Sequence, residues 1–355
     1  MTDILWQSRS PLVYESFRSG QLSPAANGGN AYDYHAVEAL SKKFSLEVDP
    51  AAVLKGNENV FAYWNRVRRI VPVSHIVIQE PYPLVFGKKK SGSKYIGMIH
   101  HIDDHLGKST LKHRWYFASL KNKLKELEAV ITVSVYWKEY LQNLGCKNVY
   151  VIYNAFQPEE FLFTESEITA FRNKHGINQD SSKPLIYIGG TSRQKGVYDV
   201  YHALKNEPYE LIMSGPHNHA ADLPVRFLNL NRREYLLLLH CANLVLTMST
   251  MIEGWNRIAH ESLLCGTPVI GSGVGGMNEL LSGAGQKIVT NPSLLPVQVR
   301  EVLTNRATFA EHGKKFVQKF NLSYFESEWT RVIEELIHQP DNKKTNGHVR
   351  NQRLV

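Results

Sequence analysis

Short apolar runs alternate with helix-type segments along nearly the whole chain, and this alternation constrains the fold more than any other feature. In the first half, such runs lie at residues 4–7, 45–48, 75–79, 95–100, 129–134 and 149–153. A second series lies at residues 185–188, 211–213, 227–230, 244–248, 268–271 and 287–290. Runs of this kind are typical of strands buried on both faces, and strand–helix alternation predicts parallel sheets covered by helices. The predicted fold class is therefore α/β.

The two series predict two Rossmann-like domains, which a chain of 355 residues can accommodate. We expect an N-terminal domain over residues 1–160, a C-terminal domain over residues 161–338 and a basic, disordered tail over residues 339–355. The final helical pattern, at residues 324–337, could pack back on the N-terminal domain. Loops at the carboxyl ends of both sheets should face a shared cleft, where doubly wound sheets bind ligands.

The net charge of +8 is unevenly distributed. Residues 1–160 hold 20 basic and 15 acidic side chains, whereas residues 161–340 hold 17 of each. A basic first half favours an anionic partner there, such as an anionic acceptor or membrane surface, which a basic-aromatic helix at residues 111–127 could contact. No nucleic-acid-binding motif accompanies the charge, so no nucleic acid is expected. Three cysteines without a CxxC pair, and no apolar leader or spanning run, predict a cytoplasmic protein.

Three short motifs suggest chemistry that the rest of the chain does not support. Gly107-Lys108-Ser109 lacks the earlier glycine of a phosphate-binding P-loop. The glycines at residues 271–276 match a dinucleotide fingerprint, but no acidic residue follows at the required distance; we expect a tight loop that approaches a ligand or another segment. Residues 101–105 contain metal-ligand types without a distant partner, so neither a metal nor another cofactor is expected.

The segment from Glu253 to Glu261 gives the most specific signal. It follows an apolar run, leads into a helical stretch that stops at Gly266, and precedes another apolar run. The two glutamates stand eight residues apart, and the helix start between them offers free N–H groups to a phosphate. Carboxylates accept hydrogen bonds from paired sugar hydroxyls. Strand, loop and helix together predict a site for a phosphorylated sugar.

This segment, with Leu-Leu-Cys-Gly-Thr-Pro-Val-Ile and Gly-Gly-Met-Asn-Glu after it, resembles the retaining GT-B glycosyltransferases of the group 1 (family four) kind. The resemblance covers nearly the whole chain. Gly28-Gly29 resembles the family's first glycine loop, and residues 189–196 resemble its phosphate loop. The family's usual Phe-Gly after the first glutamate is Trp255-Asn256 here, a departure that bears on the choice of donor sugar.

The resemblance implies a role for each matching residue. Glu253 would contact hydroxyls of the donor sugar, and Glu261 those of the ribose. Lys195 would neutralise the diphosphate leaving group, together with Arg193. One of His100 and His101 would lie near the transferred sugar. The remaining expected donor-site residues are Gly28, Gly29, Gly190, Asn256, Arg257 and Ile258.

The implied reaction moves a sugar from a nucleotide-diphosphate sugar to an acceptor with retention of anomeric configuration. The acceptor, lipid-linked or a growing glycan, would bind in the N-terminal domain. A sugar-nucleotide epimerase or a phosphorylase on the same fold is the main alternative, and a nucleic-acid-binding protein is a remote one.

Overall fold

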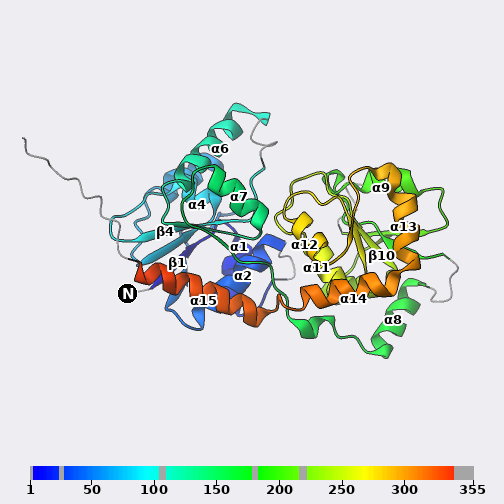
Figure 1. Cartoon of the computed structure of the whole chain (residues 1–355). Coiled ribbons are helices and arrows are strands. Elements are labelled where there is room, and N and C mark those ends of the chain that lie inside the picture. Colours follow the sequence, from blue (N-terminus) through cyan, green and yellow to red (C-terminus); the bar gives the residue numbers. More distant parts are fainter. Residues whose placement is uncertain (1–2, 24–27, 104–108, 178–182, 216–221, 340–355) are drawn as a thin grey trace, which may run out of the picture.

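The computed structural model describes residues 3–23, 28–103, 109–177, 183–215 and 222–339. Figure 1 shows two α/β units side by side, one built mainly from the first half of the chain and the other from the second half. Each contains a parallel sheet of six strands with helices against it. This architecture, with two Rossmann-like sheets, confirms the predicted fold class.

The N-terminal sheet has the strand order β2-β1-β3-β4-β5-β6, and all its pairings are parallel. Its strands are β1 (Ile4–Gln7), β2 (Leu46–Val48), β3 (Ile76–Gln79), β4 (Lys94–Ile99), β5 (Ala129–Thr132) and β6 (Val149–Val151). Every residue of β1, β3 and β5 is buried, which explains why these runs are apolar at successive positions and do not alternate. The strand order reverses between β1 and β3, so the loops that follow these two strands border a crevice.

The C-terminal sheet has the order β12-β11-β10-β7-β8-β9, again with parallel pairings. Its strands are β7 (Leu185–Tyr187), β8 (Glu210–Ser214), β9 (Arg226–Leu228), β10 (Leu244–Thr247), β11 (Val269–Gly271) and β12 (Lys287–Ile288). The order reverses between β7 and β10. The loops after these strands contain the predicted phosphate loop and the Glu253 segment, so the topology brings both motifs to one crevice.

Helices connect the strands of each sheet. In the first half they are α1 (Pro11–Ser19), α2 (Gly28–Ser41), α3 (Val60–Val67), α4 (Pro81–Phe86), α6 (Leu111–Leu124) and α7 (Val135–Asn143). In the second half they are α8 (Glu165–His175), α9 (Val197–Leu204), α10 (Arg232–Cys241), α11 (Arg257–Leu264), α12 (Met277–Gly283), α13 (Leu295–Thr304), α14 (Arg306–Val317) and α15 (Leu322–His338). Short 3-10 turns lie at η1 (Pro158–Phe161), η2 (Arg193–Lys195) and η4 (Pro292–Leu294).

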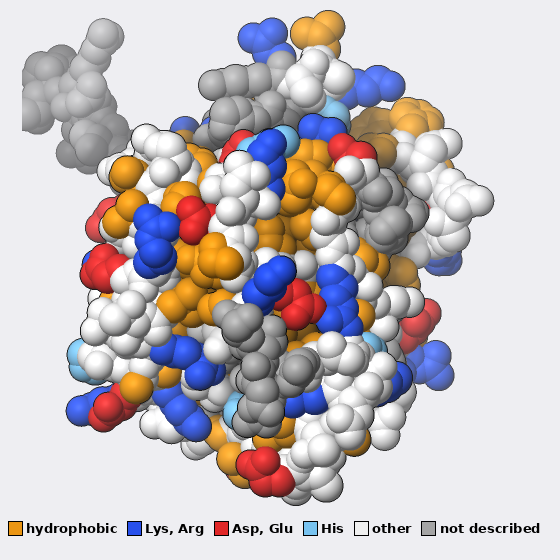
Figure 2. Space-filling view, turned by 90° about the vertical axis from the view of Figure 1, so that its right-hand side faces the viewer, with side chains coloured by type: hydrophobic (Ala, Val, Ile, Leu, Met, Phe, Trp, Pro, Cys, Tyr) orange, Lys and Arg blue, Asp and Glu red, His pale blue; other side chains and the backbone are white. Residues whose placement is uncertain are grey.

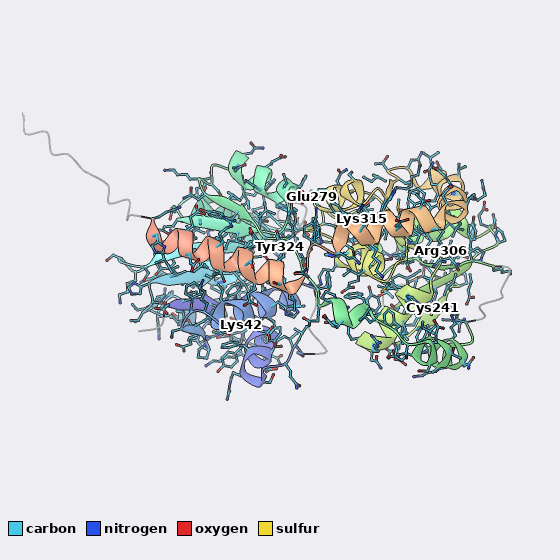
Figure 3. The ribbon with its side chains drawn as sticks, turned by 60° about the horizontal axis from the view of Figure 1, so that its bottom comes forward. Lys42, Cys241, Glu279, Arg306, Lys315 and Tyr324 are labelled. Atoms are coloured by element: carbon cyan, nitrogen blue, oxygen red, sulfur yellow. The ribbon has the colours of Figure 1, made fainter. Side chains whose placement is uncertain are left out.

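The last helix returns to the first domain. In Figure 1, α14 lies along the C-terminal unit, whereas α15 runs beneath the N-terminal sheet. The Trp329 ring of α15 lies 5.6 Å from the Trp6 ring of β1, and Lys42, which directly follows α2, forms a 2.8 Å ion pair with Glu326 of α15. Figure 3 labels Lys42 beside α2 and Tyr324 on α15. The chain therefore crosses between the two units twice: once before the first strand of the C-terminal sheet, and once between α14 and α15.

The outer face of the C-terminal unit carries both signs of charge. Figure 2 looks onto this face, and Lys and Arg side chains lie there among Asp and Glu side chains and apolar patches. This mixture agrees with the equal numbers of basic and acidic residues over 161–340. Any anion that binds to this unit would therefore depend on a few placed groups and not on a broad positive field.

Candidate active site between the two domains

Two connected cavities lie at the carboxyl ends of the sheets. The interdomain cavity has a volume of about 490 Å³ and the N-terminal cavity one of about 1240 Å³. Both are lined by Gly29, His100 and His101, so they meet at these three residues. The interdomain cavity is also lined by Gly28, Val133, Asn154, Gly189, Gly190, Lys195, Leu246, Thr247, Ser249, Met251 and residues 253–258.

Lys195 and Glu253 form an ion pair in the interdomain cavity. The Lys195 ammonium lies 2.7 Å from Glu253 Oε1, and the two residues come from the loops after β7 and β10. The Glu253 side chain is 10% exposed and that of Lys195 is 33% exposed. A cation and a carboxylate are thus placed together where the strand order reverses, which is the arrangement required to bind a phosphate beside a sugar hydroxyl.

The glycine-rich loop after β11 holds the Glu253 backbone. The Glu253 carbonyl accepts hydrogen bonds from the Gly276 N–H at 3.0 Å and, across the domain boundary, from Trp137 Nε1 at 3.0 Å. A Cβ atom on Gly275 would lie 2.4 Å from the same carbonyl. The glycines of this loop therefore allow one backbone to approach another segment, which is the interpretation that the sequence favoured over a dinucleotide fingerprint.

Replacing Gly276 by alanine should displace the glycine-rich loop that holds the Glu253 backbone. A Cβ atom there would lie 1.9 Å from the Gly254 carbonyl and 2.7 Å from Ser134 of the other domain. We expect Gly276→Ala to lower the free energy of unfolding by about 1–3 kcal/mol. Because the Glu253 loop must shift, turnover should fall by about 100-fold. Thermal unfolding and initial rates measure the two effects.

Gly20→Ala is the matched control for that substitution. Gly20 ends α1 on the N-terminal unit with a φ of 69°, and a Cβ atom there would meet no atom of the described residues within 4 Å. The same chemical change there should cost stability through backbone strain and leave turnover intact. Equal activity losses in the two variants would mean that the Gly276 contact has no special part in supporting the site.

The N-terminus of α11 faces the interdomain cavity. Asn256 caps the helix by accepting a hydrogen bond from the Ala259 N–H at 2.9 Å, and the N–H groups of Arg257 and Ile258 have no partner within the helix. Asn256 has a φ of 76°, and among the described residues it alone combines a side chain with a positive φ. Asparagine tolerates this conformation better than most residues, so it can replace the glycine usual at this position.

Glu261 lies on α11 but is only 4% exposed and does not line the interdomain cavity. Its Oε1 accepts a 2.7 Å hydrogen bond from Arg232, and its Oε2 lies 3.2 Å from the Tyr235 hydroxyl. The sequence could not reveal these partners, because both lie on α10. A ribose that binds this carboxylate would have to share or replace the contact with Arg232, whose side chain is 44% exposed.

The two neighbouring histidines have different surroundings. His100 Nε2 lies 2.9 Å from Asp33 Oδ1, so its ring is directed toward α2. Loss of hydration lowers the pKa of His101, the neighbouring His100 lowers it further, and Glu253 acts in the opposite direction. His101 is therefore the histidine whose pKa is influenced by the Lys195–Glu253 pair.

The other predicted residues are divided between the cavity and the surface. Gly28, Gly29, Gly190 and residues 256–258 line the interdomain cavity. Arg193 does not line it: its guanidinium lies over the Tyr198 ring, 4.1 Å from the centroid. Asn154 also lines the cavity, and its Oδ1 accepts a 3.2 Å hydrogen bond from Arg257.

Glu279 of α12 forms a further contact between the two domains. Its carboxylate accepts a 2.9 Å hydrogen bond from the Val135 N–H, at the start of α7. Burial raises the pKa of Glu279. Figure 3 shows Glu279 at the junction of the two units. This contact and the Trp137–Glu253 hydrogen bond both connect the two domains.

In the described residues, neither a metal cluster nor a membrane span accompanies this cavity. Within the ranges given above, no group of three or more His, Cys, Asp or Glu side chains is arranged to hold a metal ion. In the same ranges, every helix is too short or too polar to cross a bilayer. Of the motif at residues 101–105, the last two residues lie outside the described part. Contact with an anionic membrane surface stays a prediction.

The comparisons with known proteins agree with this geometry. The profile of Glycosyltransferase Family 4 matches residues 29–160. An uncharacterized glycosyltransferase of Methanocaldococcus jannaschii is 27% identical over 267 residues, which are 70% of each chain.

Solved structures share the two-domain arrangement. Sucrose-phosphate synthase from Thermosynechococcus elongatus has a TM-score of 0.74 at 17% identity, covering 95% of this chain and 99% of that one. HepE of Anabaena in complex with UDP-glucose has a TM-score of 0.66 at 17% identity, covering 94% and 100%. Profile, relative and fold lead to one conclusion: the chain has the GT-B architecture and is similar to glycosyltransferases of the group 1 (family four) type.

Proposed function

We propose that the chain transfers a sugar, with retention of configuration, from a nucleotide-diphosphate sugar in the interdomain cavity to an acceptor in the N-terminal cavity. The observation that carries the proposal is the Lys195–Glu253 pair, held 2.7 Å apart beside the α11 N-terminus. The Lys195 ammonium and the helix N-terminus suit a diphosphate, and the Glu253 carboxylate suits sugar hydroxyls. The meeting point of the cavities at His100 and His101 would bring the two substrates together.

The proposed reaction mainly requires stabilisation of the leaving group. As the bond from the anomeric carbon to the diphosphate oxygen breaks, negative charge develops on the diphosphate. The Lys195 ammonium and the N–H groups of Arg257 and Ile258 would receive this charge, and Arg193 is the second proposed cation. The acceptor oxygen would form its bond on the same face, and its proton would pass to the leaving phosphate. Glu253 would hold a hydroxyl of the sugar during this displacement.

A uridine nucleotide is the first donor to test. The HepE structures contain UDP, UDP-glucose, or UDP with glucose. Those ligands belong to that protein, and for this chain they supply the first probes in a wider series. Glu261 would hold the ribose hydroxyls, which leaves the choice of base to residues outside the Glu253–Glu261 segment.

Glu261→Ala should weaken donor binding more than it slows the chemical step. Loss of charge-assisted hydrogen bonds to a ribose is worth about 1.5–3 kcal/mol, which corresponds to a rise in donor KM of about 10- to 100-fold. Glu261→Gln keeps the shape and should cause a smaller rise. Initial rates over a range of donor concentrations separate KM from kcat. An unchanged donor KM in Glu261→Ala would contradict the ribose assignment.

Stereochemistry tests the proposed reaction directly. Proton NMR of the transfer product reports the configuration at the anomeric carbon through its coupling constant. With a donor of α configuration, the proposal predicts an α-linked product from the start of the reaction. A β-linked product would contradict retention, and conversion of the donor to another nucleotide sugar without release of the diphosphate would favour an epimerase.

A further inference from the structure

The N-terminal cavity contains two carboxyl groups for which the reaction described above has no role. Asp33 of α2 and Glu80, which precedes α4, line this cavity at the carboxyl ends of β1 and β3. Glu80 is 9% exposed, and its Oε1 is buried without a hydrogen-bond partner among the described residues. The carboxyl group interacts with the side chains of Ser8, Trp6 and Asp33 beside the cavity.

The two carboxyl groups interact, and they connect to the point where the cavities meet. Burial raises the pKa of Glu80 well above its usual range, and the nearby Asp33 raises it further. The raised pKa favours the neutral carboxyl form of Glu80, which has a hydroxyl donor as well as an acceptor. Asp33 Oδ1 lies 2.9 Å from Nε2 of His100, which lines both cavities.

A wall of aromatic rings extends from this acid pair. The aromatic wall consists of Tyr82 and Phe86 of α4 with Trp115 and Tyr116 of α6. The Tyr82 and Tyr116 centroids are 5.0 Å apart, and those of Phe86 and Trp115 are 6.2 Å apart. All four rings line the N-terminal cavity, and Trp115 is 57% exposed. Trp115 therefore offers the most accessible apolar surface of the wall, whereas the Arg9 guanidinium lies over the Tyr82 ring, 3.8 Å from its centroid.

We propose that the Glu80–Asp33 pair binds a hydroxyl group of a carbohydrate acceptor, whose ring faces contact the aromatic wall. The inference rests on the proposed function, and it deepens that function by naming the chemical class of the acceptor. A sugar ring combines apolar faces with hydroxyl groups at its edge. It therefore matches a cavity that combines aromatic surfaces with one donor and acceptor pair.

Charge argues against an acceptor whose reacting group is a phosphate. Such a group would have to reach His100 and His101, where Asp33 and Asp103 also line the cavity. Two like charges at about 4 Å repel by several kcal/mol in a partly buried site. The cations that line this cavity, Arg9 and Lys112, are exposed to solvent. A neutral hydroxyl meets no such repulsion.

Binding of simple glycosides to the full chain tests this inference without needing a donor. The probes are methyl glycosides of glucose, galactose, mannose and N-acetylglucosamine, with farnesyl phosphate as the phosphate-bearing comparison, and saturation-transfer NMR detects binding. We expect at least one glycoside to bind. Glu80→Ala should weaken it by at least about 10-fold, while Glu80→Gln, which keeps a neutral donor and acceptor, should remain within about 3-fold of wild type.

Trp115→Ala provides a second variant at an exposed position, where folding is not at risk, and it should also weaken glycoside binding. UDP affinity, measured on the same samples, should not change in any of these variants. Absence of glycoside binding, full binding by Glu80→Ala and Trp115→Ala, or binding of farnesyl phosphate in place of the glycosides would each overturn the inference. Failure of wild type to bind any nucleotide would instead count against the proposed function.

Discussion

Glu253→Ala should lower kcat by about 100- to 1000-fold, because one placed polar group in a transition-state site has an effect of that size. The substitution removes the proposed contact with the donor sugar. It also leaves the Lys195 ammonium without the carboxylate that now lies 2.7 Å away. Released from this partner, Lys195 can still bind the diphosphate, so donor KM should change less than kcat.

The alternative is that Glu253 only stabilises the start of a helix. The structure favours the catalytic interpretation, because α11 begins four residues later and the Glu253 side chain contacts Lys195. Glu301→Ala is a matched control: it breaks a 2.6 Å ion pair with Lys287 in the same domain, away from the cavity lining. Rate measurements should show full activity for this control. Similar activity in Glu253→Ala would remove Glu253 from the mechanism.

Lys195→Ala should be at least as damaging. The ammonium is the cation that lines the cavity beside Glu253, and the leaving diphosphate gains charge as the glycosidic bond breaks. We expect kcat to fall by about 100- to 1000-fold, with a further loss of donor affinity because the ground-state diphosphate is also charged. Initial rates at saturating acceptor, with varied donor, give both values.

Arg193→Ala tests whether the cation must lie at the position of Lys195 or whether any positive charge on this loop suffices. Arg193 lies two residues away in the same 3-10 turn, but its guanidinium contacts the Tyr198 ring. Its loss should therefore reduce the rate by less than the loss of Lys195. Equal losses in the two variants would mean that general positive charge on the loop suffices. No loss in Lys195→Ala would contradict the leaving-group assignment.

Much of the architecture could be predicted from the sequence, because it is encoded locally. Each strand of both sheets lies within two residues of an apolar run, since strands buried on both faces require such runs. The Glu253 segment could be recognised for the same reason: its glutamates, helix start and Gly266 stop are contiguous. These features need no knowledge of which segments meet in space.

The partners of the site residues could not be predicted, because they come from distant segments. Arg232 and Tyr235, which contact Glu261, lie on α10, and Asp33, which contacts His100, lies 67 residues earlier. The sequence treated His100 and His101 as equivalent, and only the direction of each ring distinguishes them. Glu80 belongs to no sequence motif. Only its burial beside Asp33 in the cavity distinguishes it, and that cavity forms only when the chain folds.

Release of nucleoside diphosphate from UDP-, GDP- and ADP-sugars by the wild-type chain is the most direct test of the central claim. A coupled assay for the free diphosphate reports the reaction whether the sugar passes to an acceptor or to water. We expect at least one donor to be cleaved, with release of the corresponding diphosphate, and Glu301→Ala to cleave it equally well. Absence of release from every nucleotide sugar, with and without glycosides as acceptors, would contradict the claim.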